Sequence, residues 1–427
     1  MTEPNDVTAA GEAESLVDES HPVTSSPEIP DGGLLAWLQV LGAFCLYLNT
    51  WGIVSMFGAF QSYYQTTLLV HEKPDNISWI GSVQVFLLFL GGTLSGPAFD
   101  AGYLRTLLIL GTFLSCFGMF MTSICQQYWQ FLLAQGLVVG LGFGCLFLPT
   151  IAIISQYFTT KKAIAFGIAS VGGSLGGVVF PIMFRRLELE IGFPWATRAI
   201  AFIMLGTLAI PLLTMRHRAA FPITKLRFVD LAAYRKPSLT TYVAGLFFGF
   251  MGVYVAMYYI QLYAIAKTGI SDSLSSYLLP ILNGTSIIGR LVSNYFADKA
   301  GPLNMQIPNA FAAAILCFCW IRIDNVPGIV VFAALYGIFI GSFNSLPGIS
   351  VVSLSPNLSK VGLQLGVSFV VAGLGCLIGE PIAGAILRSN GGWAGLQAWC
   401  GVLLALFGAL TLLARVSEAG LRLKAKA

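Results

Sequence analysis

Residues 130–154 read QFLLAQGLVVGLGFGCLFLPTIAII, and the polar side chains in this stretch are Gln130, Gln135 and Thr150. A helix needs about 20 mostly apolar residues to cross the hydrocarbon core of a bilayer. The stretch is long enough and apolar enough to meet that need, so it predicts a membrane-spanning helix.

Similar runs recur along the chain from Leu34 onward. The whole chain has 427 residues, of which 56% are hydrophobic and only 10% are charged, whereas soluble domains are about 25% charged. A water-soluble fold cannot hide that much apolar surface, and a lipid-facing fold need not hide it. We therefore expect an all-α membrane protein with twelve transmembrane helices, at about 34–60, 77–98, 106–125, 130–154, 163–184, 195–215, 239–264, 273–296, 305–323, 327–353, 361–387 and 395–414.

The two halves of this helix series are related. Asp100 and Asp298 each follow an even-numbered helix and lie 198 positions apart, and Pro149 and Pro347 repeat at the same offset. These matches indicate a duplicated six-helix unit and hence two pseudo-symmetric bundles. Such halves suit alternating access, in which two bundles move about a site held between them near the middle of the membrane.

The longest break in the series defines the expected domains. We expect a disordered acidic tail at 1–30, a six-helix bundle at 31–215, a cytoplasmic central loop at 216–238, a second bundle at 239–415 and a short tail at 416–427. If the N-terminus is cytoplasmic, the inner loops carry about twice as many Lys and Arg residues as the outer loops. This bias favours both termini in the cytoplasm.

Several classes of function are not expected. No GxxxxGK[ST] loop is present, so ATP is not expected to drive the protein directly. The three histidines do not converge as an enzyme would require, and the eight cysteines form no CxxC pair. We therefore expect no enzyme activity, no metal and no cofactor. We also expect no nucleic-acid partner, because the basic residues lie in short clusters between apolar runs, where orientation in the membrane explains them better.

Arg290 is the most informative residue, because a charged side chain within a span usually faces the interior or a water-filled path. Asn283 and Ser286 lie seven and four positions earlier, on the same helical face. That face predicts binding of an anionic or strongly hydrogen-bonding substrate. The alternative is that Arg290 extends to the membrane surface or pairs with Asp298. Asn49 and Asn344 are further candidates for the cavity, or else they form hydrogen bonds between helices.

Other polar residues have open interpretations. Glu380 is a candidate for proton coupling if burial raises its pKa, or a helix-end group satisfied by backbone that Pro381 frees. The tyrosines at 254, 258, 259 and 263 line the cavity or lie at the lipid interface. Asn76 begins an Asn-Ile-Ser acceptor sequence in the first outer loop, which predicts N-glycosylation.

A loop sequence supports the transporter interpretation. The segment 96–105, GPAFDAGYLR, resembles the signature of cytoplasmic loop 2–3 in the major facilitator superfamily, and 294–301, NYFADKAG, resembles its weaker second copy. A carboxylate at a helix end with an Arg within reach can form a charge-assisted latch between bundles. Asp100, Arg105 and Asp298 are therefore expected to gate the protein. The alternative is a solvated turn whose charges set the topology.

Further motifs resemble the monocarboxylate porter family within that superfamily. They are Asp31-Gly-Gly with Trp37, the segment 42–44 (GAF), Tyr157-Phe158 with Lys161-Lys162, the segment 165–167 (AFG), and Gly289-Arg290. The segment 195–198, WATR, looks most like the fungal branch. The resemblance implies a transporter that works as a monomer in the plasma membrane.

Two departures from that family bear on the substrate. Its proton-coupled lactate and pyruvate carriers have a Lys where this chain has Ser55, and an Asp where it has Ser286. The family's Lys–Asp–Arg relay is therefore not implied here, and a larger, less polar organic substrate is favoured. We expect efflux of a fungal secondary metabolite, with uptake of a monocarboxylate or vitamin-like solute as the alternative.

Overall fold

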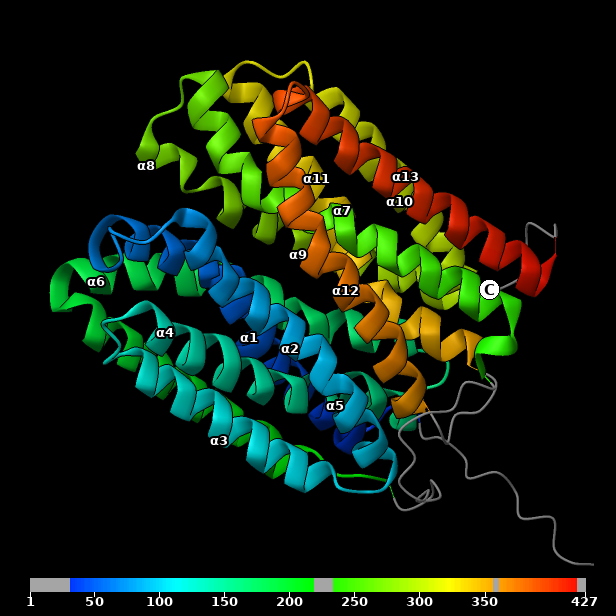
Figure 1. The fold of residues 1–427 in the computed structure, drawn as a ribbon. Helices are drawn as coiled ribbons and strands as arrows, with labels where there is room; N and C mark the ends of the chain where they lie inside the picture. The colour runs from blue at the N-terminus through cyan, green and yellow to red at the C-terminus, as the bar shows by residue number, and fades with distance from the viewer. Residues whose placement is uncertain (1–30, 219–232, 356–360, 421–427) are drawn as a thin grey trace, which may run out of the picture.

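The computed structural model describes residues 31–218, 233–355 and 361–420. These residues form helices and connecting turns (Figure 1). The predicted tail at 1–30 and the central-loop residues Lys225 and Arg227 lie outside the described residues.

The N-terminal half follows the predicted helix order closely. It consists of α1 (Leu34–Tyr63), α2 (Pro74–Asp100), α3 (Leu104–Thr122), α4 (Tyr128–Phe131), α5 (Gly140–Tyr157) and α6 (Lys162–Thr214), with the π-helical stretches η1 (Tyr64–Leu68) after α1 and η2 (Leu132–Val139) between α4 and α5. The elements α4, η2 and α5 are continuous, so together they form one span that contains the apolar stretch 130–154.

The C-terminal half begins after the short 3-10 helix η3 (Ala233–Arg235). It consists of α7 (Pro237–Thr268), α8 (Asp272–Ser275), α9 (Leu278–Ala300), α10 (Pro302–Trp320), α11 (Val326–Leu354), α12 (Val361–Arg388) and α13 (Gly392–Ala419). The last helix continues to Ala419, about one helical turn beyond position 415, where we expect the second bundle to end.

The helix α6 comprises two spans. At Gly192 the backbone has φ 76° and ψ 164°, which is not helical, and the chain turns there. Glycine has no Cβ, so it adopts such a positive φ without steric cost. The first span extends beyond the predicted end at 184, because 185–191 remains helical although its charged residues suggested a loop.

Ten helices of the described chain are long and apolar enough to cross a membrane. Counting α6 as two spans and adding α9 gives the twelve expected spans. The helix α9 is less apolar than the other spans because it carries Asn283, Ser286, Arg290 and Asn294, all of which are buried inside the protein. Its polar residues face protein rather than lipid.

Two helix pairs make the most extensive contacts between the two halves. The helix α2 packs against α12, and the first span of α6 packs against α9. Glycines permit the close approach of α2 and α12: a Cβ added to Gly96 would lie 2.1 Å from the carbonyl oxygen of Gly362. No larger residue fits at Gly96 unless these two helices move apart.

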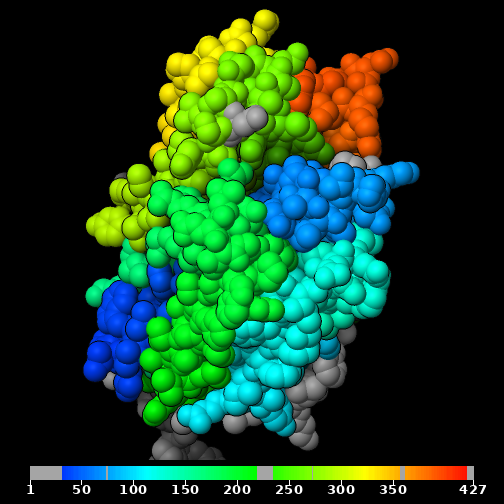
Figure 2. Space-filling view, turned by 90° about the vertical axis from the view of Figure 1, so that its left-hand side faces the viewer, coloured from blue at the N-terminus to red at the C-terminus, as the bar shows by residue number. Residues whose placement is uncertain are grey.

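The halves are closed at one end and separated at the other. Where α2 ends and α12 begins, backbone atoms of the two halves touch, and we call this the latch end. At the opposite end a cavity of about 380 Å³ lies between the first turns of α2 and the last turns of α12, and we call it the vestibule. Figure 2 looks onto this end, with the blue start of α2 below the orange end of α12.

Candidate functional site

Arg290 lies halfway along α9, inside the protein. It is 5% exposed, and its Nε and Nη1 atoms are buried without a hydrogen-bond partner among the described residues. Its nearest electrostatic neighbours are the phenol groups of Tyr47 on α1 and Tyr254 on α7. Buried polar groups are normally hydrogen-bonded, so the Arg290 guanidinium has buried donors that a ligand with acceptor oxygens could engage.

Aromatic rings from the two halves meet at the boundary on which Tyr254 lies. Trp51 of α1 and Tyr254 of α7 stack with their centroids 6.1 Å apart and an angle of 9° between their planes. Phe89 of α2 and Phe369 of α12 stack at 5.8 Å with an angle of 4°. Each pair takes one ring from each half, so the centre of the protein is an aromatic boundary between the two bundles.

The predicted neighbours of Arg290 on α9 face the same boundary. The Ser286 hydroxyl lies 2.6 Å from the Ser174 hydroxyl of α6. The Asn283 carboxamide packs against Gly177 of α6, where an added Cβ would lie 2.9 Å from its Cγ atom. In this conformation α6 therefore covers both side chains, and they would become available to a ligand only when α6 and α9 separate.

The two predicted asparagines have different positions. Asn344 of α11 lies at the centre, where its Oδ1 accepts a hydrogen bond of 3.1 Å from the Tyr254 hydroxyl. Asn49 does not face the centre, because its side chain donates to Thr207 of α6 within the N-terminal half, at 2.8 Å. The prediction that Asn49 lines the cavity is therefore wrong for this structure, and the alternative of a hydrogen bond between helices describes it.

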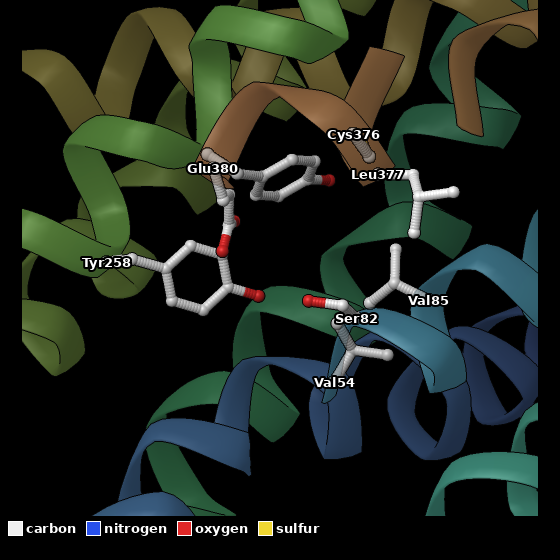
Figure 3. A pocket seen from close by; sticks show the side chains of 8 residues that line it. Val54, Ser82, Val85, Tyr258, Cys376, Leu377 and Glu380 are labelled. Atoms are coloured by element: carbon white, nitrogen blue, oxygen red, sulfur yellow. The ribbon is translucent and has the colours of Figure 1, made fainter. Parts of the chain in front are cut away.

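Glu380 lies where two cavities meet. It lines the vestibule and also a much smaller cavity of about 20 Å³, which Val54, Ser82 and Tyr254 help to line. Figure 3 shows its carboxylate directed at the ring of Tyr258, whose hydroxyl points toward Ser82 of the other half. The carboxylate is thus placed between the vestibule and the centre.

The helix-7 tyrosines do not act as one stripe. Tyr254 and Tyr258 line the smaller cavity, and Tyr259 lines the vestibule. Tyr263 is buried inside the C-terminal half, with its ring 5.2 Å from that of Trp320. The cavity interpretation therefore holds for the first three tyrosines, and Tyr263 fits neither interpretation.

The two predicted gating aspartates bind helix N-termini across the boundary. Asp100 at the end of α2 accepts hydrogen bonds from the backbone N–H groups of Gly362 and Leu363 on α12, at 3.2 and 3.0 Å. Asp298 near the end of α9 accepts from Ala163 and Ile164 on α6, at 2.7 and 2.8 Å. A carboxylate is stabilised there by the free amides and by the helix dipole.

The contact that joins the two halves does not involve Arg105, the partner that we expected from the sequence. Arg105 lies exposed in the first turn of α3, whereas the contacts that bridge the halves are carboxylate–amide hydrogen bonds. The sequence prediction of an Asp-to-Arg latch was therefore wrong in its partner, because backbone amides leave no signature in a sequence.

Asp31 is a residue that we did not predict to act at a site. Its carboxylate accepts from the backbone N–H groups of Thr159 and Thr160, at 2.8 and 3.0 Å, and from the Thr160 hydroxyl. Partial burial opposes its charge, but these hydrogen bonds lower the pKa of Asp31 to about 2. The ring of Trp37 packs edge-on at 5.3 Å against Phe158. Together they fix the start of α1 to the turn that leads into α6.

The described residues contain no group of three or more His, Cys, Asp and Glu side chains that could hold a metal ion. The site instead combines one buried cation, two neighbouring phenol groups, and hydroxyl and amide groups at the boundary between the two halves.

Comparison with known proteins places this arrangement in a family. The family profile described as Major Facilitator Superfamily matches residues 40–326. The chain is 40% identical over 374 residues to an MFS-type transporter, dbaD, of Emericella nidulans, covering 87% of this chain and 84% of that protein. It is 37% identical to the aspyridones efflux protein apdF of the same fungus, covering 93% and 82%.

A solved structure shows the same fold. The crystal structure of the transporter FucP in the outward conformation superposes with a TM-score of 0.68 at 15% identity, covering 89% of this chain and 98% of that chain. The sequence match over most of the chain, together with this fold, shows that the protein belongs to the Major Facilitator Superfamily.

Proposed function

We propose that this protein exports an organic anion, a secondary metabolite of a fungal host, by alternating access. The observation that carries the proposal is Arg290, a buried guanidinium without a hydrogen-bond partner at the boundary between two halves. The charge has been taken out of water at high cost, and an anionic substrate would offset that cost. A relative that is 37% identical to this chain is named an efflux protein, and this name supports export as the direction of transport.

The proposed substrate site comprises Arg290, Asn344, Asn283 and Ser286. Arg290 would hold the anion. The Asn344 carboxamide would form a hydrogen bond with the substrate beside Tyr254, with which it already forms one. Asn283 and Ser286 would join when the halves move, since α6 covers them here. We assign Asn49 to helix packing instead.

The proposed gate comprises Asp100 and Asp298, whereas Arg105 is assigned only to the exposed first turn of α3. If the latch end is cytoplasmic, as the charge bias favours, both termini are cytoplasmic and this conformation opens to the outside. The substrate would enter from the cytoplasm after the two carboxylate–amide contacts break, and it would leave through the vestibule.

We assign the protein to the monocarboxylate porter family and to the plasma membrane, where it would act as a monomer. The motif at Asp31 supports the family, because its residues form a defined contact with the turn before α6. Asn76, in the first turn of α2 near the vestibule, would carry an N-linked glycan. Loss of a glycosidase-sensitive mobility shift in Asn76→Gln would test that assignment.

Deletion of the gene tests the direction of transport. We would profile metabolites inside the cells and in the medium, with re-expression as the control. Export predicts a compound that accumulates inside the cells and disappears from the medium. A solute that stays in the medium while the cells lack it would replace export with uptake of a carboxylate or vitamin-like solute.

A further inference from the structure

Trp51 and Tyr254 form a ring pair that joins the two halves beside Arg290. Tyr254 lines the smaller cavity of about 20 Å³, and it is also an electrostatic neighbour of Arg290. Trp51 stacks on Tyr254 from the opposite half, with 6.1 Å between ring centroids. A ligand held by Arg290 on the side of Tyr254 therefore meets this ring pair.

The surroundings of this ring pair are also aromatic. The Trp51 ring has Phe89 at 5.7 Å and Phe147 at 5.8 Å, both in edge-on geometry. On the other half, Phe250 lies 6.1 Å from Tyr254. Aromatic rings favour stacked and edge-on contacts with other aromatic rings over contacts with saturated groups of equal area. A guanidinium is itself flat and suits a flat, delocalised anion.

We propose that the substrate is a flat, conjugated organic anion, and that Trp51 and Tyr254 select it by contact with its ring face while Arg290 binds its charge. This inference rests on the proposed function, because it assumes that Arg290 binds the substrate. It adds a selection against saturated acids of the same size and charge, which Arg290 alone would not provide. Trp51 and Tyr254 are thus assigned as specificity-determining residues.

Two acids with the same carbon skeleton size and charge test this selection. The probes are 2-naphthoate, which is flat and aromatic, and trans-decalin-2-carboxylate, which is saturated. Each is titrated against the purified full-length protein, and its dissociation constant is obtained from the rise in Tm with ligand concentration. The wild-type protein should bind 2-naphthoate at least about tenfold more tightly, because ring stacking adds to burial.

Replacing Trp51 or Tyr254 by leucine should remove the preference for the aromatic acid and leave carboxylate binding at Arg290 intact. In Trp51→Leu and in Tyr254→Leu, we expect the two acids to differ by no more than about threefold, since the ring face is lost. Trp51→Phe keeps an aromatic face and should retain most of the preference, and unchanged binding of the saturated acid by the leucine variants would show that these variants are folded. Trp129→Leu is the matched control, because Trp129 is 56% exposed in α4 and away from the centre.

The outcomes separate this inference from the proposed function. Arg290→Ala should weaken binding of both acids. If the wild-type protein binds both acids equally and Arg290→Ala loses both, the anion site stands and the ring selection is wrong. If neither acid stabilises the wild-type protein, or if Arg290→Ala binds both as the wild type does, the anion site is wrong and the inference falls with it. Retained discrimination in both leucine variants would also overturn it.

Discussion

The Asp298 carboxylate of α9 accepts hydrogen bonds from the first free amides of α6, beginning with Ala163 at 2.7 Å. The equivalent contact in the other direction joins Asp100 to Gly362 at 3.2 Å. Each half therefore uses the carboxylate at the end of its second helix to cap the fifth helix of the other half. Two symmetric contacts close the latch end, and both must break before the protein can open there.

Neutralising these carboxylates should destabilise the closed latch end. A hydrogen bond to a charged group contributes about 1.5–3 kcal/mol, so Asp100→Asn and Asp298→Asn should favour the conformation that is open at the latch end. We expect turnover to fall roughly three- to tenfold, with KM changed less than about twofold, because the substrate site is untouched. Initial transport rates over a range of substrate concentrations would measure both. Asp324→Asn, an exposed turn residue, is the control, and a pure loss of affinity would argue against a latch.

Gly96→Ala should act on the same equilibrium through sterics. The added Cβ would lie 2.1 Å from the Gly362 carbonyl oxygen, so α2 and α12 could not close. The vestibule should then open less often, and an impermeant maleimide should label Ser82→Cys more slowly in the Gly96→Ala background. Gly206→Ala is the control, because it makes the same substitution at a position with no atom within 4 Å of the new methyl group. Equal labelling rates in the two backgrounds would contradict the contact.

The stability difference between the wild type and Asp31→Asn should depend on pH. Its pKa is about 2 in the folded protein and about 3.9 in an unfolded chain, so the folded state favours the charged form. Its contribution is complete above about pH 4 and is lost as the pH falls toward 2. Asp31→Asn should therefore lower the Tm by the same amount from pH 8 to pH 5, and the gap to the wild type should shrink below pH 4. A gap that persists unchanged at pH 3 would show that the ionised carboxylate is not the cause.

Glu380→Gln tests proton coupling. If Glu380 carries the coupling proton, the variant should lose accumulation driven by a pH gradient and keep counterflow, since counterflow needs no net proton movement. Both are measured in proteoliposomes with the metabolite that the gene deletion identifies. Accumulation that stays pH-driven in this variant would remove Glu380 from coupling and leave it as a residue of the release path.

Much of the fold could be predicted from the sequence, because span length and apolar composition follow directly from the thickness of the bilayer. The duplicated halves were visible in the repeat of Asp100 and Asp298. The polar face of α9 was also visible, since Asn283, Ser286 and Arg290 repeat with the helical period.

The remaining parts of the site depend on how the helices are rotated and paired. A buried asparagine can face either the centre or a neighbouring helix. Because α1 packs against α6, Asn49 donates a hydrogen bond to Thr207 instead of facing the centre. Trp51 and Tyr254 lie about two hundred positions apart, and no local pattern predicts that their rings stack. The partners of Asp100 are backbone amides, which every residue but proline carries.

Transport by Arg290→Ala tests the central claim most directly. The metabolite identified by gene deletion is loaded into proteoliposomes, and its counterflow is compared in the wild type, Arg290→Ala and Arg290→Lys, with exposed Arg322→Ala as the control. Removing one partner of a buried charge pair costs about 2–5 kcal/mol, so kcat/KM should fall at least roughly thirtyfold in Arg290→Ala while the control matches the wild type. Wild-type counterflow in a correctly folded Arg290→Ala protein would contradict the account.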